Sequence, residues 1–241
     1  MSPFAPGAVL ANRYALDRKL GDDGLTEVWT ATDRVLARQV VVEGASEEAG
    51  DAGRAAFREA AAAAARLVHS GIVATYDSGV VDGAPYIVTE RPAGATLAEL
   101  VARGGPLAPG RVVVVGRQLA RALQVAHGQG VTHGGVGPRT VLVTEDDRAK
   151  LSRFAACGAR ARLGGATAEK EADVHACAAA LVTALVGSEG AVSPRAARSG
   201  VPPALDEVLV AAQEGGSITD AGALAAALDG LDIDDDAVPL V

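Results

Sequence analysis

The sequence predicts an α+β chain in which a small, mainly antiparallel β lobe precedes a larger, mainly helical lobe. Strand-like segments with alternating or β-branched residues follow one another from Arg13 to about Thr89. One alanine-rich helix interrupts them, and helical patterns dominate from Thr96 onward. We expect residues 89–94, which contain a Pro and a Gly, to join the two lobes.

The β lobe is expected to consist of short strands and one helix. The strands share alternating or β-branched residues and read RYALDRKL, TEVWTATD, RQVVVEG, IVATYDSG and APYIVTE. Turns are expected at residues 21–24, 33–34 and 82–83, where Gly, Asp and other turn residues gather. The helix is expected over Phe57 to Val68, because alanine is the best helix former.

The helical lobe is expected to carry a short strand pair between its second and third helices. The pair is TVLVTEDDRAKLSRF, which turns at residues 145–147. The helices are predicted at residues 96–103, 109–129, 172–186, 203–213 and 219–228. Because the third of these is apolar on nearly every side, we expect it to be a buried central helix, with Asp173 at its positive end and Gly187 as its stop.

The composition excludes several classes of protein. The chain has 241 residues, of which 49% are hydrophobic, so it can bury a substantial core. A net charge of −8 and an aromatic content of 3% argue against nucleic acid or anionic lipid as partners. The most apolar run, residues 176–186, is shorter than the roughly 20 residues that cross a bilayer, and the first residues do not read as a signal peptide. Cys157 and Cys177 suit free thiols in a reducing compartment, so we expect a cytoplasmic location.

The order of these segments resembles a bacterial Ser/Thr protein kinase of the eukaryotic type, from about Asn12 to Leu228. The likeness is carried by the glycine-rich loop at residues 21–28 and by FREAAAAAARLVHSGIVATYDSG, PYIVTERPAGATL, QLARALQVAHGQGVTHGGVGPRTVLV, KLSRFAA and ADVHACAAALVTALVG. It implies a two-lobed protein-kinase-like fold with one αC helix in the β lobe. We predict an N-terminal extension, an N-lobe, a C-lobe and an acidic tail at residues 1–11, 12–90, 91–230 and 231–241.

The resemblance also implies that the family's charged catalytic residues are replaced. Phosphoryl transfer uses a lysine on the phosphates, magnesium ligands and a carboxylate near the accepting hydroxyl. Glu43 stands at the position of the family's third-strand Lys, and Ala60 at that of its αC Glu. Gly135 matches the catalytic Asp and Gly137 the Lys after it. Thr140 matches the magnesium Asn and Arg153 the metal-binding Asp. The positions matching the nucleotide cleft are Gly21, Asp23, Gly24, Val28, Val41, Thr89, Glu90 and Leu142.

These replacements predict that Mg-ATP does not bind and that no cofactor or metal is held. Asp22, Asp23 and Glu43 would confront a triphosphate with like charge, and Val41 is bulkier than the family's Ala. Residues 155–172 replace the family's activation segment with a short Gly/Ala-rich loop without an A-P-E motif. The resemblance assigns structural roles to His133, Phe154 and Asp173.

Other features leave two interpretations each. Glu43 and Arg153 carry swapped charges, so we favour a salt bridge between them, while the alternative is that each is solvated separately. Asp173 and Cys177 share a helix face, but His175 lies about 200° from Asp173, which argues against a metal site.

Cys157 is a reactive thiol or, as we favour, an inert small residue. Residues 60–65 are a docking surface or, as we favour, part of a thin helix packed closely on the sheet. Thr167 and Thr219 are candidate phosphoacceptors or unmodified loop residues.

We therefore predict a catalytically inactive pseudokinase, not an enzyme, that binds a protein partner as a scaffold or regulator. It resembles the intracellular pseudokinase domain associated with the MviN/MurJ-type peptidoglycan-precursor flippase of actinobacteria. That resemblance implies a forkhead-associated or cell-envelope protein as partner and a longer membrane protein as context, although the acidic tail has no Thr for a phosphosite. The alternative is an atypical Ser/Thr kinase or nucleotide-binding switch with weak ATP affinity, in which Arg153 contacts phosphate directly.

Overall fold

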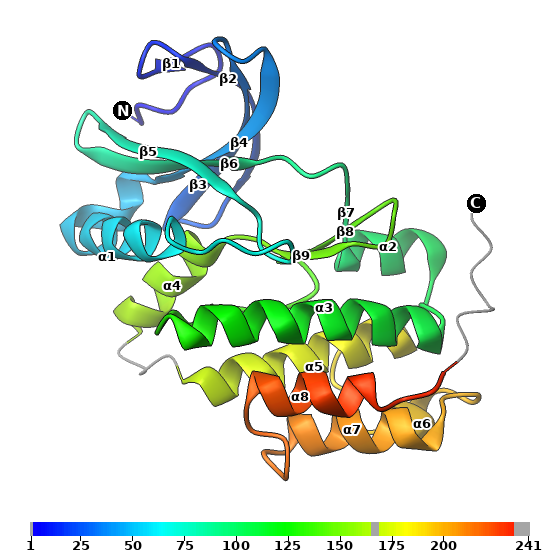
Figure 1. The fold of residues 1–241 in the computed structure, drawn as a ribbon. Coiled ribbons are helices and arrows are strands. Elements are labelled where there is room, and N and C mark those ends of the chain that lie inside the picture. The colour runs from blue at the N-terminus through cyan, green and yellow to red at the C-terminus, as the bar shows by residue number, and fades with distance from the viewer. Residues whose placement is uncertain (1, 165–168, 234–241) are drawn as a thin grey trace. The chain divides into compact units, whose positions relative to one another are not determined.

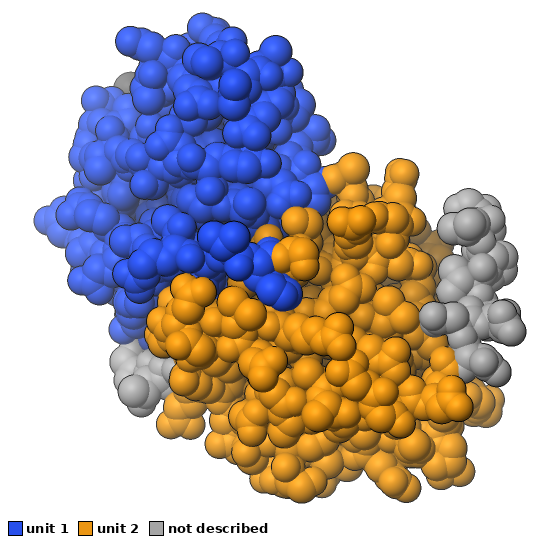
Figure 2. Space-filling model, in the orientation of Figure 1, with its two compact units in different colours: residues 1–69, 73–92, 153–168 blue, residues 70–72, 93–152, 169–241 orange. Residues whose placement is uncertain are grey.

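A computed structural model describes residues 2–164 and 169–233 (Figure 1). The chain forms two compact units, shown in blue and orange in Figure 2. The first unit comprises residues 1–69, 73–92 and 153–168, and the second comprises residues 70–72, 93–152 and 169–241. The segment 153–168 therefore belongs to the first unit, although in sequence it lies between two long segments of the second, residues 93–152 and 169–241. The predicted α+β class, with a sheet-rich and a helical part, is confirmed.

The first unit is built on a six-stranded antiparallel sheet with strand order β1-β2-β3-β4-β6-β5. The strands are β1 Val9–Leu10, β2 Tyr14–Asp22, β3 Thr26–Asp33, β4 Arg38–Ala45, β5 Thr75–Val81 and β6 Ala84–Glu90. Register is regular between β3 and β4, where Val28 pairs with Glu43 and Thr30 with Val41. Two strands, β2 and β3, lie between the edge strand β1 and β4, and the pairing places Glu43 beside the part of β3 that follows the turn after β2.

The core of this sheet includes an aromatic residue from the predicted N-terminal extension. Phe4 is 3% exposed and packs in one cluster with Tyr14, Trp29 and Val42. A Cβ atom added at Gly44 would overlap the Phe4 ring, so the glycine makes room for it. Residues near position 4 thus contribute to the packing of the first unit.

The helix predicted over Phe57 to Val68 begins and ends earlier. A 3-10 turn, Glu47–Ala49, leads into α1, Gly50–Ala64. The start of α1 contains Gly50 and Gly53, and glycine disfavours a helix interior, but Gly53 is buried and leaves no room for a Cβ, because Ala49 and Leu25 pack over it. Tertiary packing therefore outweighs the low helix propensity of glycine.

A second helix in this unit contradicts the prediction of a loop after Phe154. Helix α4, Phe154–Leu163, packs against α1 (Figure 1). Ala, Arg and Leu are good helix formers, and the small side chains of the two helices meet, since a Cβ added at Gly158 would lie 3.3 Å from the Cβ of Ala60. Ala60 is 2% exposed. The alanine-rich face of α1 is therefore closely packed, as expected, but it packs against α4 as well as against the sheet.

The second unit is mainly helical and holds a small three-stranded sheet. The strands are β7 Gly94–Thr96, β8 Val141–Thr144 and β9 Ala149–Leu151. The helices are α2 Leu97–Gly104, α3 Pro109–Gly128, α5 Lys170–Val186, α6 Pro194–Ala197, α7 Pro203–Gln213 and α8 Ala221–Asp229. The expected central helix is confirmed, because α5 buries residues such as Val174, Leu181 and Leu185 and ends at Gly187 with a positive φ of 85°.

Candidate functional site

The turn between β2 and β3 is held together by the side chain of Asp23. Its Oδ1 atom accepts hydrogen bonds from the Thr26 amide at 2.8 Å, the Leu25 amide at 3.2 Å and the Thr26 hydroxyl at 3.2 Å. Gly24 has a φ of +79°, a left-handed conformation that glycine adopts without strain. The turn amides are therefore occupied by a carboxylate of the turn itself.

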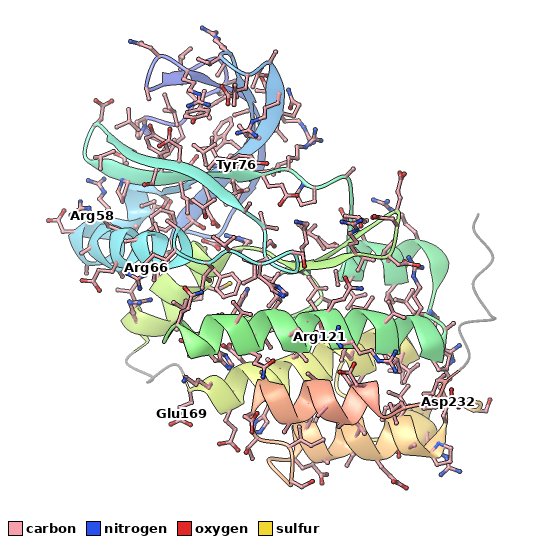
Figure 3. The ribbon with its side chains drawn as sticks, viewed as in Figure 1. Arg58, Arg66, Tyr76, Arg121, Glu169 and Asp232 are labelled. Carbon is pink, nitrogen blue, oxygen red and sulfur yellow. The ribbon has the colours of Figure 1, made fainter. Side chains whose placement is uncertain are left out.

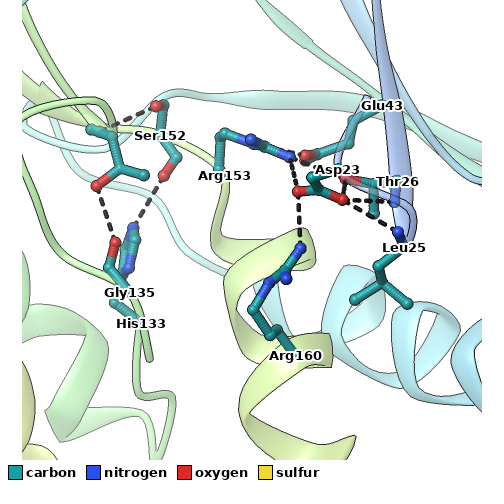
Figure 4. Close-up of polar contacts among 10 residues, drawn as sticks. Asp23, Leu25, Thr26, Glu43, His133, Gly135, Ser152, Arg153 and Arg160 are labelled. Atoms are coloured by element: carbon teal, nitrogen blue, oxygen red, sulfur yellow. Dashed lines mark hydrogen bonds and ion pairs between the residues drawn. The ribbon is translucent and has the colours of Figure 1, made fainter. Parts of the chain in front are cut away.

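Two arginines of the α4 segment reach the other oxygen of Asp23. Its Oδ2 atom lies 3.1 Å from Nη2 of Arg153 and 2.8 Å from Nη2 of Arg160. Figure 4 draws both contacts as dashed lines. Arg153 is the N-cap residue of α4 and has a left-handed φ of 67°, which is uncommon for a residue with a side chain. The start of α4 thus brings two cations to the turn.

Glu43 on β4 is a further partner of Arg153. The Arg153 Nε atom donates to Glu43 Oε1 at 2.9 Å, and its Nη2 atom donates to the Thr26 hydroxyl at 2.8 Å. The Glu43 side chain is 6% exposed and that of Arg153 is 30% exposed. The structure therefore brings together the two residues whose swapped charges suggested a salt bridge, and it adds Asp23, Thr26 and Arg160 to them.

The protonation equilibria in this cluster reflect burial and the two arginines. Burial raises the pKa of Glu43 above its ordinary value, against the opposing effect of Arg153. Burial also acts to raise the pKa of Asp23, but the Thr26 amide and the two guanidinium groups outweigh it, so that pKa is lowered. Two carboxylates and two guanidinium groups therefore face one another with their charges balanced.

Cys157 lies one turn after Arg153 on α4, and its amide donates to the Arg153 carbonyl at 3.0 Å. Burial raises the pKa of the Cys157 thiol to about 12. A thiol with so high a pKa carries almost no thiolate at neutral pH, which favours the interpretation of Cys157 as an inert small residue.

In the second unit, Asp173 near the start of α5 accepts several hydrogen bonds from the loop after α3. Its Oδ2 atom accepts from the His133 amide at 2.7 Å and lies 2.9 Å from His127 Nε2, and its Oδ1 atom accepts from the Gly134 amide at 2.8 Å. Burial acts to raise the pKa of Asp173, but these hydrogen bonds outweigh it and lower the pKa. Asp173 therefore ties the loop to the central helix.

The same loop is organised by a threonine hydroxyl. Thr140 Oγ1 accepts from the Gly137 amide at 2.9 Å and donates toward the carbonyls of Gly135 and Gly137 at 3.0 and 3.1 Å. The ring of His133 approaches the Ser152 carbonyl at 2.8 Å. This part of the loop places backbone groups and one hydroxyl, but no carboxylate, at positions 135–140.

The remaining predicted site residues fall into both units. Those on the sheet of the first unit are Gly21, Val28, Val41, Thr89 and Glu90. Leu142 lies on β8 in the second unit, and Phe154 begins α4 in the first. Among the residues that the structure describes, no group of three His, Cys, Asp or Glu side chains is placed to hold a metal ion. No helix within residues 2–164 and 169–233 is long and apolar enough to span a membrane.

Two contributors to these clusters were missed in the sequence. Arg160 was assigned to a loop, so nothing indicated that it would face the β2–β3 turn. His127 falls within the helix expected over residues 109–129, where no pattern indicates a role for it, and its contact with Asp173 joins residues 46 positions apart. The helix-forming residues around Arg160 were a usable signal.

A family model described as protein tyrosine and serine/threonine kinase matches residues 14–175. This chain belongs to that family. The kinase domain is of the bacterial Ser/Thr type, since 152 residues are 37% identical to the probable serine/threonine-protein kinase PknB of Corynebacterium glutamicum. That match covers 61% of this chain and 24% of the relative. A second match, 30% identical over 234 residues, is to the serine/threonine-protein kinase PknE of Mycobacterium tuberculosis and covers 81% of this chain and 41% of the relative.

The solved structures include a kinase neighbour of the same fold. Rad53 residues 1–466 in complex with AMP-PNP match with a TM-score of 0.69 and 19% identity, over 90% of this chain and 64% of that one. The predicted protein-kinase-like fold is thereby confirmed. The kinase domain described here spans less than half the length of the curated relatives it matches.

The prediction of a catalytically inactive scaffold, and of a chain that is not an enzyme, is contradicted by these relatives, which are named serine/threonine-protein kinases. The alternative, an atypical Ser/Thr kinase or nucleotide-binding switch, agrees better with them. The prediction of an inactive domain rested on each substituted catalytic position taken separately. Phosphoryl transfer depends mainly on positioning and charge stabilisation, to which cations that were not counted, such as Arg160, can contribute.

Proposed function

We propose that this kinase domain is an atypical Ser/Thr kinase that works as a nucleotide-binding switch with weak affinity for ATP. The observation that carries the proposal is the position of Arg153, whose guanidinium contacts Glu43, Asp23 and Thr26 at one end of the glycine-rich turn. Membership of the Ser/Thr kinase family supplies the class of reaction.

The two states of the proposed switch differ in what Arg153 binds. In the state described by the structure, its guanidinium is shared between two carboxylates. In the nucleotide-bound state, Arg153 exchanges one acidic partner for a phosphate group, with which guanidinium forms strong charge-assisted hydrogen bonds. Because the phosphate replaces an existing ion pair and does not fill a free site, only the difference between the two interactions contributes to affinity. This exchange accounts for weak binding.

The residues near the turn fit the phosphates of a nucleotide in part. Arg153 and Arg160 supply positive charge, and the amides of Leu25 and Thr26 are donors of the kind that bind phosphate oxygens. When bound, ATP supplies the phosphoryl group that a serine or threonine hydroxyl accepts. Arginine beside a transferring phosphoryl group stabilises the developing charge. We assign this stabilising role to Arg153.

The place of action and the partner belong to the same proposal. ATP chemistry and two free cysteines are consistent with a cytoplasmic domain. A protein partner of the forkhead-associated or cell-envelope type stays a prediction from the resemblance. If such a protein binds, we expect it to act as a substrate or regulator of the switch.

The proposal is tested by thermal unfolding of the native domain with ATP, with and without Mg²⁺ or Mn²⁺. A ligand that binds only the folded state raises the unfolding midpoint. We expect a rise at millimolar ATP in the native domain and in Arg66→Ala, which removes an exposed arginine just after α1 (Figure 3). We expect a much smaller rise in Arg153→Ala. Transfer of labelled phosphate from ATP to a generic protein substrate is followed in the same samples.

Two outcomes would overturn the proposal. An unfolding midpoint that does not respond to millimolar ATP in any of the three proteins would exclude nucleotide binding. An equal response in the native domain and in Arg153→Ala would show that Arg153 does not contact the phosphate. The Arg66→Ala variant controls for the loss of one positive charge, because each variant removes one.

A further inference from the structure

The carboxylate of Asp23 is bound by the kinds of group that bind a phosphate. Its Oδ1 atom accepts hydrogen bonds from two backbone amides and one hydroxyl, and its Oδ2 atom faces two guanidinium groups. Backbone amides of a turn and pairs of arginines are common partners of phosphate oxygens in proteins. Figure 4 shows these donors converging on the one carboxylate.

The neighbouring Asp22 shows that the turn alone does not create this arrangement. Asp22 Oδ1 also accepts a turn amide, from Gly24 at 2.9 Å. Its Oδ2 atom, however, has one cationic partner among the described residues, Lys19, which is three residues away at 2.6 Å, and both side chains are more than a third exposed. Asp23 is distinguished by cations that come from more than 125 positions further along the chain.

The charges around Asp23 would favour an anion if its carboxylate moved away. With Asp23 in place, two guanidinium groups face two carboxylates, those of Asp23 and Glu43. Without Asp23, Arg153 and Arg160 would face Glu43 alone, and the amides of Leu25 and Thr26 would lose their acceptor. An excess of one positive charge and open donors would then be left at the turn.

We infer that the amides of Leu25 and Thr26, with Arg153 and Arg160, form a phosphate-binding site that the Asp23 carboxylate occupies as a tethered competitor. The ligand class is a phosphate or polyphosphate group. The inference rests on the proposed function for its biological role, since it names the acidic partner that a nucleotide displaces. Asp23 sets the weak affinity, and its displacement is the switching step.

The test measures binding of inorganic pyrophosphate, which lacks the nucleoside, to native protein, Asp23→Ala and Asp22→Ala by titration calorimetry. The two variants remove the same charge from adjacent positions. We expect Asp23→Ala to bind pyrophosphate at least about tenfold more tightly than the native protein, which corresponds to about 1.4 kcal/mol. We expect Asp22→Ala to change the affinity by less than about threefold, as a general charge effect does. Adding Arg160→Ala to Asp23→Ala should remove most of the gain.

Equal gains in Asp23→Ala and Asp22→Ala, or no gain in Asp23→Ala, would overturn the inference. Circular dichroism checks that each variant is folded. If Asp23→Ala does not fold, Asp23→Asn is compared with Asp22→Asn; it removes the charge that faces Arg153 and Arg160 while its amide oxygen can still accept from the turn amides, so we expect a smaller gain that is again specific to position 23. Failure of this test is distinguishable from failure of the proposed function, because ATP binding by the native protein is measured separately.

Discussion

The Arg153 guanidinium lies 2.9 Å from the Glu43 carboxylate, although 110 positions separate the two residues in sequence. Both belong to the same compact unit, because the segment that begins at Arg153 packs with the sheet that carries Glu43. The contact matters for stability, because a carboxylate on a side chain that is 6% exposed keeps its charge only with a cation nearby.

Removing the cation from this pair should destabilise the first unit. Arg153→Ala leaves Glu43 buried beside Asp23 without its partner, so we expect a loss of about 2 kcal/mol in the free energy of unfolding. We expect a smaller loss than for a fully buried ion pair, because the Arg153 side chain is 30% exposed. Urea unfolding of Arg153→Ala, of Glu43→Gln/Arg153→Ala and of Arg66→Ala measures it.

The double variant decides the cause of that loss. Because Gln at position 43 carries no charge, Glu43→Gln/Arg153→Ala should recover part of the stability, while Arg66→Ala should change it little. A double variant that is no more stable than Arg153→Ala would show that the unpaired charge of Glu43 does not cause the loss.

Neutralising Asp173 should loosen the loop after α3. Asp173→Asn removes a charged acceptor from the amides of His133 and Gly134, and we expect a loss of about 2 kcal/mol. The exposed Glu169→Gln, labelled at position 169 in Figure 3, is the control. Hydrogen exchange at the two amides locates the effect, and unchanged exchange there would contradict the account.

The pH dependence of stability gives an independent check on Asp173. Its pKa is lower in the folded than in the unfolded chain, so its contribution is present above the ordinary carboxyl value and is lost as the pH falls through the folded value. We expect the native domain to lose stability as the pH falls below the ordinary carboxyl value of about 4, and Asp173→Asn to lose less. Parallel pH profiles for the two proteins would count against this assignment.

Shortening the Phe4 side chain should affect the sheet far more than truncating an exposed residue. Phe4→Ala opens a cavity over Gly44, and we expect a loss of about 3 kcal/mol in the free energy of unfolding. Val35→Ala, at a position 69% exposed, should change it by less than about 0.5 kcal/mol. Similar losses in both would mean that Phe4 does not pack as described.

Both cysteines should resist thiol reagents in the folded protein. Burial raises the pKa of Cys157 and of Cys177 to about 12 each, so almost no thiolate is present near neutral pH. We expect labelling by a disulfide reagent to follow global unfolding as urea is increased. Rapid labelling of one thiol in the native protein, mapped to Cys157, would show that it is reactive.

The sequence predicted the fold well where periodicity and propensity agree. The apolar segment 172–186 became the buried helix α5, and the alternating segments became β2, β3, β4 and β6. It failed for residues 154–163, whose glycine and small residues suggested a loop. The helix forms because its small face packs against α1, a long-range contact that a local pattern does not contain.

The candidate site was predictable only in part for the same reason. Opposite charges at two positions defined by the family resemblance suggested the pairing of Glu43 with Arg153. The contact of Arg160 with Asp23 depends on helix α4, which was not predicted. The prediction that the domain is not an enzyme is contradicted by its relatives, which are named serine/threonine-protein kinases.

The most direct measurement is a crystal structure of the native domain grown with millimolar ATP and Mg²⁺. The account predicts a phosphate group within hydrogen-bonding distance of the Arg153 guanidinium, with the Asp23 carboxylate moved away from the turn amides. A nucleotide bound with Arg153 still held by both Asp23 and Glu43 would contradict it, as would a crystal in which these contacts are unchanged and no nucleotide is present.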